Sequence, residues 1–436
     1  MVSNAPIDLA AFAAIWNAGA VVVPVHRANP AATIAELLQA TGARIAIDAD
    51  ANAGLPSSWR QHGQLRTGPL NPPTPRELLS GAALILFTSG STGRPKGVVL
   101  SHQAFAGKLD TIDSLANFQA GQRSLLVLNL SFVFANWLSL LVLRSGGTLL
   151  MHARFTASEF IEALARGDIM RVGVVPTMMR SLLAQNSNDP ATKALIAPAL
   201  RQLLIGGESL DARLTADIES VLPDAQLINA YGLTETCGND FYLLPSDRPR
   251  FTGCIGRPAP QIRYRIVGEN GQEVSPGEAG ELQLRTPFAM SGYLDAPELT
   301  TAAFMDGWFR TGDIARLRED GVVELAGRAK EIISRGGNKV SPMEIERAFA
   351  DHPQVAAVMA TGVSDPMLGE RIHLLVVPRH GCVINKTELL SHAAARLPRF
   401  KQPDTIHFAS ELPLGRTGKA DRGTLRRRLE ERGEAA

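Results

Sequence analysis

Cysteine is scarce in this chain of 436 residues, which has only Cys237, Cys254 and Cys382. Three widely spaced cysteines without a CxxC pair argue against a disulfide framework or structural zinc, and they are typical of a reducing compartment. Neither sign of charge is in excess, because 44 Lys plus Arg stand against 43 Asp plus Glu. A net charge of +1 provides no global basic field for nucleic acid. We therefore expect a cytoplasmic protein without nucleic acid as a partner.

Long apolar segments that are free of polar interruptions are also lacking. Residues 9–25 are rich in Ala and Val, but no Lys or Arg precedes them, so a signal peptide would lack its positive region. Residues 124–143 are uncharged and about as long as a membrane span. Asn129, Asn136 and several serines interrupt this stretch at a cost to insertion. We favour a buried strand, loop and helix here over the alternative of a membrane span.

The chain has the composition of a folded globular protein, with 45% apolar residues and a mean hydropathy of +0.02. Apolar β-type runs alternate with helical patterns over the first 250 residues, which predicts an α/β fold with mostly parallel sheets. Strands are expected at 20–25, 44–47, 84–88, 125–130, 172–175, 202–205 and 226–229. Short runs between Gly and Asp turns at 262–326 predict a small antiparallel β unit.

Beyond residue 330 the pattern is that of a small α+β domain. It predicts a helix at 342–351, strands at 355–363 and 371–378, and a helix at 386–397. Residues 421–436 form a charged helical tail, which we expect to present a solvated face.

The sharpest local feature is a Gly- and Ser-rich loop between two apolar runs, within residues 84–102. Its glycines allow the backbone to approach an anion, and Lys96 adds positive charge, which together predict a triphosphate-binding loop. It is not a Walker A loop, because Arg94 and Pro95 separate Gly93 from the lysine. A mobile linker is the alternative, which the flanking β-type runs disfavour.

Residues 88–97 (TSGSTGRPKG) resemble the phosphate loop of the adenylate-forming superfamily of acyl-CoA synthetases, peptide-synthetase adenylation domains and luciferases. Four further motifs follow in the family's order, and the resemblance covers about residues 4–422. They are NAYGLTET at 229–236, WFRTGD at 308–313, GRAKEIISRGGNK at 327–339 and LPLGRTGKADR at 412–422.

The resemblance implies a site for ATP. In the family, the tyrosine at Tyr231 stacks on adenine, the threonine at Thr234 lies at the α-phosphate, and the glutamate at Glu235 binds Mg²⁺. Asp313 takes the two ribose hydroxyls, for which a carboxylate is a natural double acceptor, and Arg328 lies nearby. The implied ATP- and AMP-binding residues are Thr88, Ser89, Gly90, Ser91, Thr92, Gly93, Lys96, Gly207, Glu208, Tyr231, Gly232, Thr234, Asp313, Arg328 and Lys419.

The resemblance also implies a mobile lid. It assigns residues 1–329 to an N-terminal ATP- and acid-binding domain and 330–436 to a C-terminal lid, with the hinge at Lys330. Lys419 matches the mobile catalytic lysine, and Thr88 and Glu235 complete the implied catalytic set. Gly336 and Gly337 match the loop that lines the pantetheine tunnel. Relative to the family, we expect the N-terminal part to be short at its front.

The acid-binding segment departs from the family's patterns. Val133 stands where relatives that activate amino acids carry an Asp, and Leu130-Ser131 replaces the aromatic-His pair of many CoA ligases. An apolar pocket with one amide suits an aryl or medium-size acyl acid, although the aromatic residues here could equally be plain core. The candidate pocket residues are Ser131, Phe132, Phe134, Asn136 and Trp137.

The predicted function is that of an AMP-forming acid–thiol ligase. It would use ATP, Mg²⁺ and CoA to convert a small carboxylic acid into an acyl-adenylate and then a thioester. The motifs around 206–208 and 229–235 resemble peptide-synthetase adenylation domains, whereas residues 327–346 resemble CoA ligases. One alternative is therefore an enzyme that loads the phosphopantetheine of a carrier protein. A catalytically weak nucleotide-binding relative is the second alternative, and the oligomeric state is not predicted.

Overall fold

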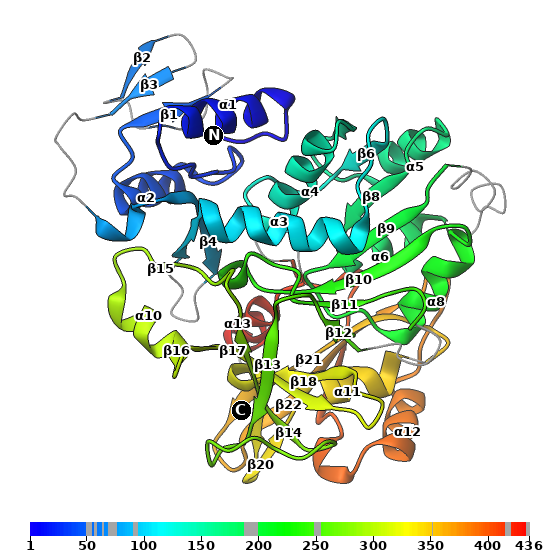
Figure 1. The fold of residues 1–436 in the computed structure, drawn as a ribbon. Coiled ribbons are helices and arrows are strands. Elements are labelled where there is room, and N and C mark those ends of the chain that lie inside the picture. Colours follow the sequence, from blue (N-terminus) through cyan, green and yellow to red (C-terminus); the bar gives the residue numbers. More distant parts are fainter. Residues whose placement is uncertain are drawn as a thin grey trace.

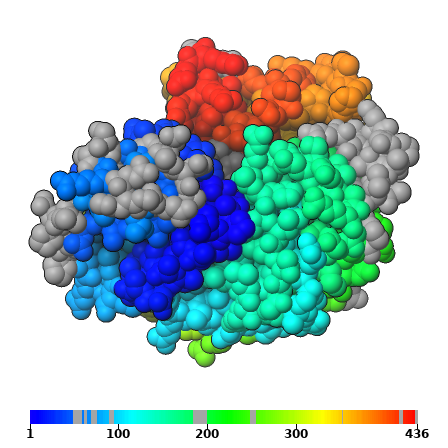
Figure 2. Space-filling model, turned by 90° about the horizontal axis from the view of Figure 1, so that it is seen from above, coloured from blue at the N-terminus to red at the C-terminus, as the bar shows by residue number. Residues whose placement is uncertain are grey.

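A computed structural model describes residues 1–48, 55, 59–62, 65–68, 76–89, 95–186, 199–247, 254–350, 352–414 and 420–432. Figure 1 shows a large N-terminal part built on several sheets and a smaller C-terminal part at the lower edge of the view. In the space-filling view, the C-terminal residues in orange and red lie along one side of the N-terminal part (Figure 2).

A seven-stranded sheet forms the centre of the N-terminal part, in the order β12-β11-β10-β9-β8-β6-β7. Its five strands from β10 to β7 run parallel, and β11 and β12 add antiparallel pairs at one edge. The strands are β6 (Arg123–Leu126), β7 (Thr148–Met151), β8 (Arg171–Val174), β9 (Gln202–Gly206), β10 (Gln226–Tyr231), β11 (Phe241–Leu243) and β12 (Arg257–Pro258). The connecting helices are α4 (Val133–Arg144), α5 (Ala157–Ala165), α6 (Pro176–Asn186) and α8 (Ala212–Val221).

Short polar side chains begin several of the helices by capping their first turn. Thr156 accepts from the amide of Glu159 before α5, and Asp211 accepts from the amide of Leu214 before α8. The predicted strand, loop and helix within 124–143 are confirmed as β6, a turn and α4. The strand is shorter than expected, because it ends at Leu126. In the described part of the chain, no helix has the length and apolar character needed to cross a membrane.

The phosphate-loop motif forms a hairpin of β4 (Ala82–Ser89) and β5 (Pro95–Ser101), with β15 (Gly292–Tyr293) on the outer side of β5. Helix α3 (His102–Ala116) follows at once, capped by the Ser101 hydroxyl, which accepts from the amide of Ala104 at 3.1 Å. The hairpin register places Thr88 opposite Lys96. The loop residues Gly90–Arg94 between the strands lie outside the described residues.

At the N-terminal end, α1 (Pro6–Asn17), α2 (Ala31–Thr41) and the small sheet β1 (Ile45–Ile47), β3 (Leu65–Thr67) and β2 (Arg60–His62) precede the 3-10 turn η1 (Glu77–Leu79). The strand expected at 20–25 is wrong. Only Val22 bridges to β4, at Leu84. Pro24 has no amide hydrogen and cannot extend this pairing.

The predicted antiparallel unit is confirmed as the order β13-β14-β17-β16, with β18 paired to β17. Its strands are β13 (Arg263–Val267), β14 (Ala279–Arg285), β16 (Phe304–Met305), β17 (Trp308–Leu317) and β18 (Val323–Arg328), and α10 (Pro297–Ala303) precedes β16. The β17–β18 register places Asp313 opposite Arg328. Residues from two separate motifs are thereby brought side by side.

The C-terminal part has its own sheet and its own apolar core. The sheet order is β20-β19-β22-β21, with β23 parallel to β22, and the core includes Ile345, Phe349 and Leu389 from the covering helices. The strands are β19 (Ile333–Arg335), β20 (Asn338–Val340), β21 (Val355–Asp365), β22 (Gly369–Pro378) and β23 (Thr405–Phe408). The helical elements are η3 (Ala329–Glu331), α11 (Pro342–Ala350), α12 (Lys386–Arg396), η4 (Arg399–Lys401) and α13 (Arg422–Glu431).

The expectation that the last helix is a solvated face is wrong. Leu425 and Leu429 are buried, and their cluster includes Met359 and Val363 of β21. Two leucines at i and i+4 are enough to dock a helix that is otherwise charged, because both project from one face. The strongly polar composition of the helix hides this short apolar stripe in the sequence.

Candidate active site

Three of the predicted nucleotide-binding residues lie at the carboxyl ends of adjacent parallel strands. Tyr231 ends β10, and Gly207 and Glu208 follow β9. Thr177, which was not predicted, follows the next strand, β8, at the start of α6. The carboxyl ends of parallel strands share one edge of a sheet, where ligands of open α/β sheets bind. The topology alone therefore collects these motifs in one place (Figure 1).

The turn from Tyr231 to Asp240 carries the second motif and closes tightly on itself. The amide of Asp240 donates to the carbonyl of Tyr231 at 2.6 Å, and the 3-10 turn η2 (Thr234–Thr236) lies between them. A Cβ placed on Gly232 would lie 2.1 Å from the amide nitrogen of Asn239. Glycine is required there because the two sides of the turn approach each other so closely.

Tyr231, Asp313 and Arg328 form one hydrogen-bonded chain. The Tyr231 hydroxyl donates to Oδ2 of Asp313 at 2.5 Å, and Nε of Arg328 donates to Oδ1 at 2.9 Å. Burial, together with the Asp313 carboxylate, raises the pKa of the Tyr231 phenol well above its usual value, so the phenol remains a donor. The same carboxylate raises the pKa of Arg328.

The Asp313 carboxylate can accept further hydrogen bonds beyond these two contacts. An ionised carboxylate offers about four lone-pair positions, and the two contacts above use one on each oxygen. Arg328 is 48% exposed, which leaves one side of the pair accessible from solvent. Each oxygen can therefore accept one further hydrogen bond, which matches the two hydroxyls of a vicinal diol.

Glu235 is tied to a strand of the phosphate-loop sheet. The Tyr293 hydroxyl on β15 donates to Oε1 of Glu235 at 3.0 Å, and the amide of Met290 donates to the Glu235 carbonyl at 2.7 Å. The Lys96 ammonium lies 5.2 Å from the centroid of the Tyr293 ring. Burial and the carboxylate of Glu235 raise the pKa of Tyr293. The structure thus links the first two motifs through Tyr293, which sequence reasoning missed because it belongs to none of them.

One carboxylate oxygen of Glu208 is hydrogen-bonded to the neighbouring helix α6. Its Oε2 accepts from the amide of Thr177 at 3.0 Å and from the Thr177 hydroxyl at 2.7 Å, at the start of α6. Its Oε1 is buried and has no hydrogen-bond partner among the described residues. The role predicted for Gly207 and Glu208 in the adenine pocket stays a prediction, and the structure adds that Glu208 also anchors α6.

The candidate acid-pocket residues divide into two groups. Asn136 is fully buried, and its Nδ2 donates at 2.7 Å to the carbonyls of Leu130 and Phe132, so it holds the loop before α4. Ser131 donates to the side chain of Asn129 at 2.8 Å. The Nδ2 group of Asn136 and the Ser131 hydroxyl are thus occupied within their own segment, whereas Oδ1 of Asn136 is buried without a hydrogen-bond partner among the described residues.

The aromatic candidates lie at the start of α4, which approaches the Tyr231–Asp240 turn. Phe134 stacks on Trp137, with ring centroids 4.7 Å apart and planes 9° from parallel. Trp137 is buried in the main core, whereas Phe132 and Phe134 are half-buried. A Cβ on Gly238 would lie 3.4 Å from Cγ1 of Val133, so the first turn of α4 faces the nucleotide-side turn. Phe132 and Phe134 remain candidates for contact with an acid.

The predicted hinge and thiol-channel residues lie at the start of the C-terminal part. Lys330 is exposed in η3, three residues before the first strand of the small sheet. Gly336 and Gly337 form the turn between β19 and β20, both with positive φ, at 56° and 80°. Lys419 and Gly90–Gly93 lie outside the described residues, as does the side chain of Ser89.

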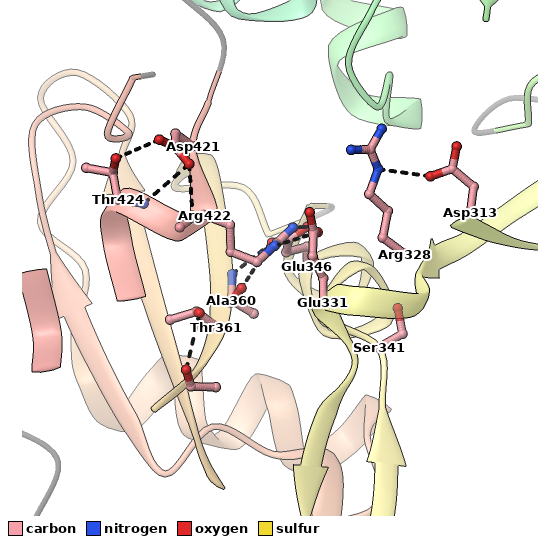
Figure 3. A network of polar contacts seen from close by, with 12 residues as sticks. Asp313, Arg328, Glu331, Ser341, Glu346, Ala360, Thr361, Asp421, Arg422 and Thr424 are labelled. Atoms are coloured by element: carbon pink, nitrogen blue, oxygen red, sulfur yellow. Dashed lines mark hydrogen bonds and ion pairs between the residues drawn. The ribbon is translucent and has the colours of Figure 1, made fainter. Parts of the chain in front are cut away.

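Arg422 joins the hinge segment to two other elements, a cluster that sequence reasoning missed (Figure 3). Its Nε pairs with Glu331 of η3 at 3.0 Å, and Nη1 pairs with Glu346 of α11 and donates to the carbonyl of Ala360 on β21. Figure 3 shows this cluster beside the Asp313–Arg328 pair, with Arg328 only three residues before Glu331. One guanidinium thus fixes helix α13 against the segment that leads into the small domain.

Replacing Arg422 by methionine is expected to lower the free energy of unfolding by about 2 kcal/mol, because two partly buried carboxylates would lose the guanidinium that they share. The matched control is Arg426→Met on the same helix, whose pairs with Glu370 and Glu430 are more exposed. That change should cost at most about 1 kcal/mol. Chemical denaturation of both variants measures the difference, and equal losses would contradict the importance given to Arg422.

Comparisons with known proteins identify the family of the chain. Residues 1–294 match the AMP-binding enzyme family, and residues 344–419 match the AMP-binding enzyme C-terminal domain. The feruloyl-CoA synthase of Amycolatopsis sp is 31% identical, over 98% of this chain and 87% of that protein. The indoleacetate–CoA ligase of Aromatoleum aromaticum is 32% identical, over 85% of this chain and 72% of that protein.

A solved structure of an ATP-binding enzyme has the same fold. ATP-bound MatB from Rhodopseudomonas palustris superposes with a TM-score of 0.82 at 25% identity, covering 97% of this chain and 86% of that one. The resemblance inferred from the motifs is confirmed, as is the predicted fold class. The chain belongs to the AMP-binding enzyme family.

Proposed function

We propose that the protein is an AMP-forming ligase that joins a carboxylic acid to the thiol of CoA. The observation that carries the proposal is the chain of contacts from Tyr231 through Asp313 to Arg328, which leaves two acceptor positions on a buried carboxylate. A ribose diol fits these positions, and the aromatic face of Tyr231 is a suitable platform for a base. The activities named for the two CoA-ligase relatives support CoA, rather than a carrier protein, as the acceptor.

In the first half-reaction, a carboxylate oxygen of the acid attacks the α-phosphorus of ATP. The bond from that phosphorus to the bridging oxygen of the β-phosphate breaks, and pyrophosphate leaves. Lys96, the hairpin amides and Lys419 would neutralise charge on the phosphates, as catalysis of this kind depends on positioning and electrostatics. Thr88, opposite Lys96 in the hairpin, and Thr234 would donate to the phosphates.

A magnesium ion fits the donor set at Glu235. One oxygen of this half-buried carboxylate accepts from Tyr293, and the other has no hydrogen bond from the described residues, as suits an ion that keeps most of its ligands as water and phosphate oxygens. When bound, the ion would reduce the charge on the phosphate oxygens. Glu235 would hold it, and Tyr293 would hold Glu235 in place.

In the second half-reaction, the CoA thiol loses its proton to solvent and attacks the acyl carbon of the adenylate. The bond from that carbon to the carboxylate oxygen that attacked phosphorus in the first step breaks, and AMP leaves with this oxygen. We assign residues 1–329 to the nucleotide- and acid-binding domain and 330–436 to a lid that turns about Lys330. The lid would bring Lys419 to the site for the first step and the Gly336–Gly337 turn for the second. We place the enzyme in the cytoplasm, in keeping with its reducing-type cysteine content.

The acid would bear an aryl or medium-size apolar group. Phe132 and Phe134 are half-buried at the first turn of α4, with Val133 facing Gly238 of the nucleotide-side turn. Apolar and aromatic walls with few polar groups suit such acids. The named substrates of the two relatives, ferulate and indoleacetate, are also aryl acids.

Acid-dependent exchange of pyrophosphate into ATP tests the proposal. The panel should contain ferulate, indoleacetate, benzoate, short fatty acids and amino acids, each followed by CoA and by a phosphopantetheinylated carrier protein. We expect exchange with an aryl or medium-size acid, and thioester with CoA. Binding of ATP without exchange for any acid would indicate a nucleotide-binding relative, and thioester formation on the carrier alone would contradict CoA as the acceptor.

A further inference from the structure

A fully buried ion pair closes the base of the Tyr231–Asp240 turn and lies outside the five sequence motifs. Nζ of Lys108 on α3 lies 2.8 Å from Oδ1 of Asp240, and both side chains are 0% exposed. The two residues are 132 positions apart in the chain. Burying two charges in this way carries a large desolvation cost, so the pair must be held by good geometry and further hydrogen bonds.

Those further contacts all belong to the turn or to its surroundings. Oδ2 of Asp240 accepts from the hydroxyl of Thr236, directly after Glu235, and the backbone amide of Asp240 donates to the carbonyl of Tyr231. Nζ of Lys108 also approaches the carbonyl of Asn239 at 3.4 Å. The pair therefore closes the base of the turn and contacts it at both ends and in its middle.

The charge on Asp240 depends on this lysine. Burial raises the pKa of the Asp240 carboxyl, whereas the Lys108 ammonium and the Thr236 hydroxyl act in the opposite direction. Nζ of Lys108 also lies over the Phe288 ring, 5.1 Å from its centroid. Without Lys108, the buried carboxylate would keep only neutral hydrogen-bond donors such as the Thr236 hydroxyl and would take up a proton more readily.

We propose that Lys108 and Asp240 are positioning residues that hold the Tyr231–Asp240 turn in the conformation that binds MgATP. The proposal rests on the function proposed above. The turn carries Tyr231 at one end and Glu235 in its middle, and neither can keep its contact to Asp313 or Tyr293 if the base of the turn opens. A buried ion pair often contributes little net stability compared with apolar residues, so its effect is expected on conformation more than on folding.

The experiment compares Lys108→Met, Asp240→Asn and the double variant with the wild type. The matched control is Arg144→Met at the end of α4. It removes two more exposed ion pairs, to Asp110 and Asp113, which lie on α3 with Lys108. The melting temperature of each variant is measured first, and the other measurements are made well below it. They are the amide hydrogen exchange of residues 231–240 and the Kd of the non-hydrolysable probe α,β-methylene-ATP with Mg²⁺. The KM of ATP and the KM of the acid are then measured in pyrophosphate exchange.

The two single variants should melt at lower temperature, because each leaves one buried charge unpaired. The double variant should recover much of that loss, because neither charge remains. In all three variants, amide exchange across the turn should be about tenfold faster, and the Kd of the probe about tenfold higher. A tenfold change is what the loss of about one net hydrogen bond produces. The KM of the acid should stay within about twofold, and Arg144→Met should change none of these quantities.

The outcomes separate a positioning role from a merely structural one. If the double variant regains wild-type exchange and probe binding along with its stability, the pair is not a positioning device. Equal rises in the KM of ATP and of acid, or failure of the single and double variants alike to fold, would also overturn the proposal. If the wild type binds no probe, the proposed function fails, while the exchange measurements on the turn still decide the role of Lys108 and Asp240.

Discussion

Replacing Lys419 with alanine is expected to slow adenylate formation by about 10³-fold or more, because the transition state would lose a cation between the acid and the α-phosphate. Thioester formation from a supplied acyl-adenylate should stay within about threefold of the wild type, since the phosphorus chemistry is already complete. Single-turnover assays of each half-reaction measure the two effects. Lys419 lies outside the described residues, so the expectation comes from its motif alone.

The matched control is Lys386→Ala, which removes an exposed lysine from the same C-terminal part at the start of α12. It makes the same change of charge and side chain away from the nucleotide motifs, so both half-reactions should proceed at the wild-type rate. If Lys419→Ala slowed both half-reactions equally, the lysine would not be specific to the first step. The proposed division of labour between two lid positions would then be wrong.

The sequence predicted the strands β9 and β10, after which two of the motifs follow. Neighbouring parallel strands end at the same edge of the sheet. The residues that follow β9 and β10 therefore lie close together, whatever the length of the segment between the strands. The pairing of Asp313 with Arg328 was not predicted as a contact, although both residues were assigned to the ribose. It depends on the β17–β18 register, which is shifted between Ile314 and Ala315. No pattern in a single sequence encodes such a shift.

The charged residues that sequence reasoning missed are fully or partly buried, and their partners lie far along the chain. Lys108 stands in an amphipathic helix, where a lysine is normally assigned to the solvent face, and its partner Asp240 lies far along the chain. Arg422 was assigned to a charged tail for the same reason. Composition identifies charge but not burial, and burial decides whether a charged side chain holds a structure together.

Among the residues that the structure describes, Asp313 should show the largest effect on catalysis. Asp313→Ala should lower kcat/KM for ATP by about 10³-fold, because two hydrogen bonds to a charged acceptor contribute about 1.5–3 kcal/mol each. Arg328 and the Tyr231 hydroxyl would also lose their common partner. Steady-state kinetics with ATP and with 2′-deoxy-ATP measures the loss and assigns it to the ribose.

The deoxynucleotide makes the assignment specific. The wild type should prefer ATP over 2′-deoxy-ATP by about tenfold or more, whereas Asp313→Ala should discriminate little, since it has no carboxylate for either hydroxyl. The matched control is Tyr231→Phe, which removes one hydrogen bond to Asp313 but keeps the ring and the carboxylate. It should lower kcat/KM by no more than about tenfold and retain the preference for ATP. If Asp313→Ala still preferred ATP as strongly as the wild type, the ribose would be bound elsewhere, and the carboxylate would serve only to orient Tyr231 and Arg328.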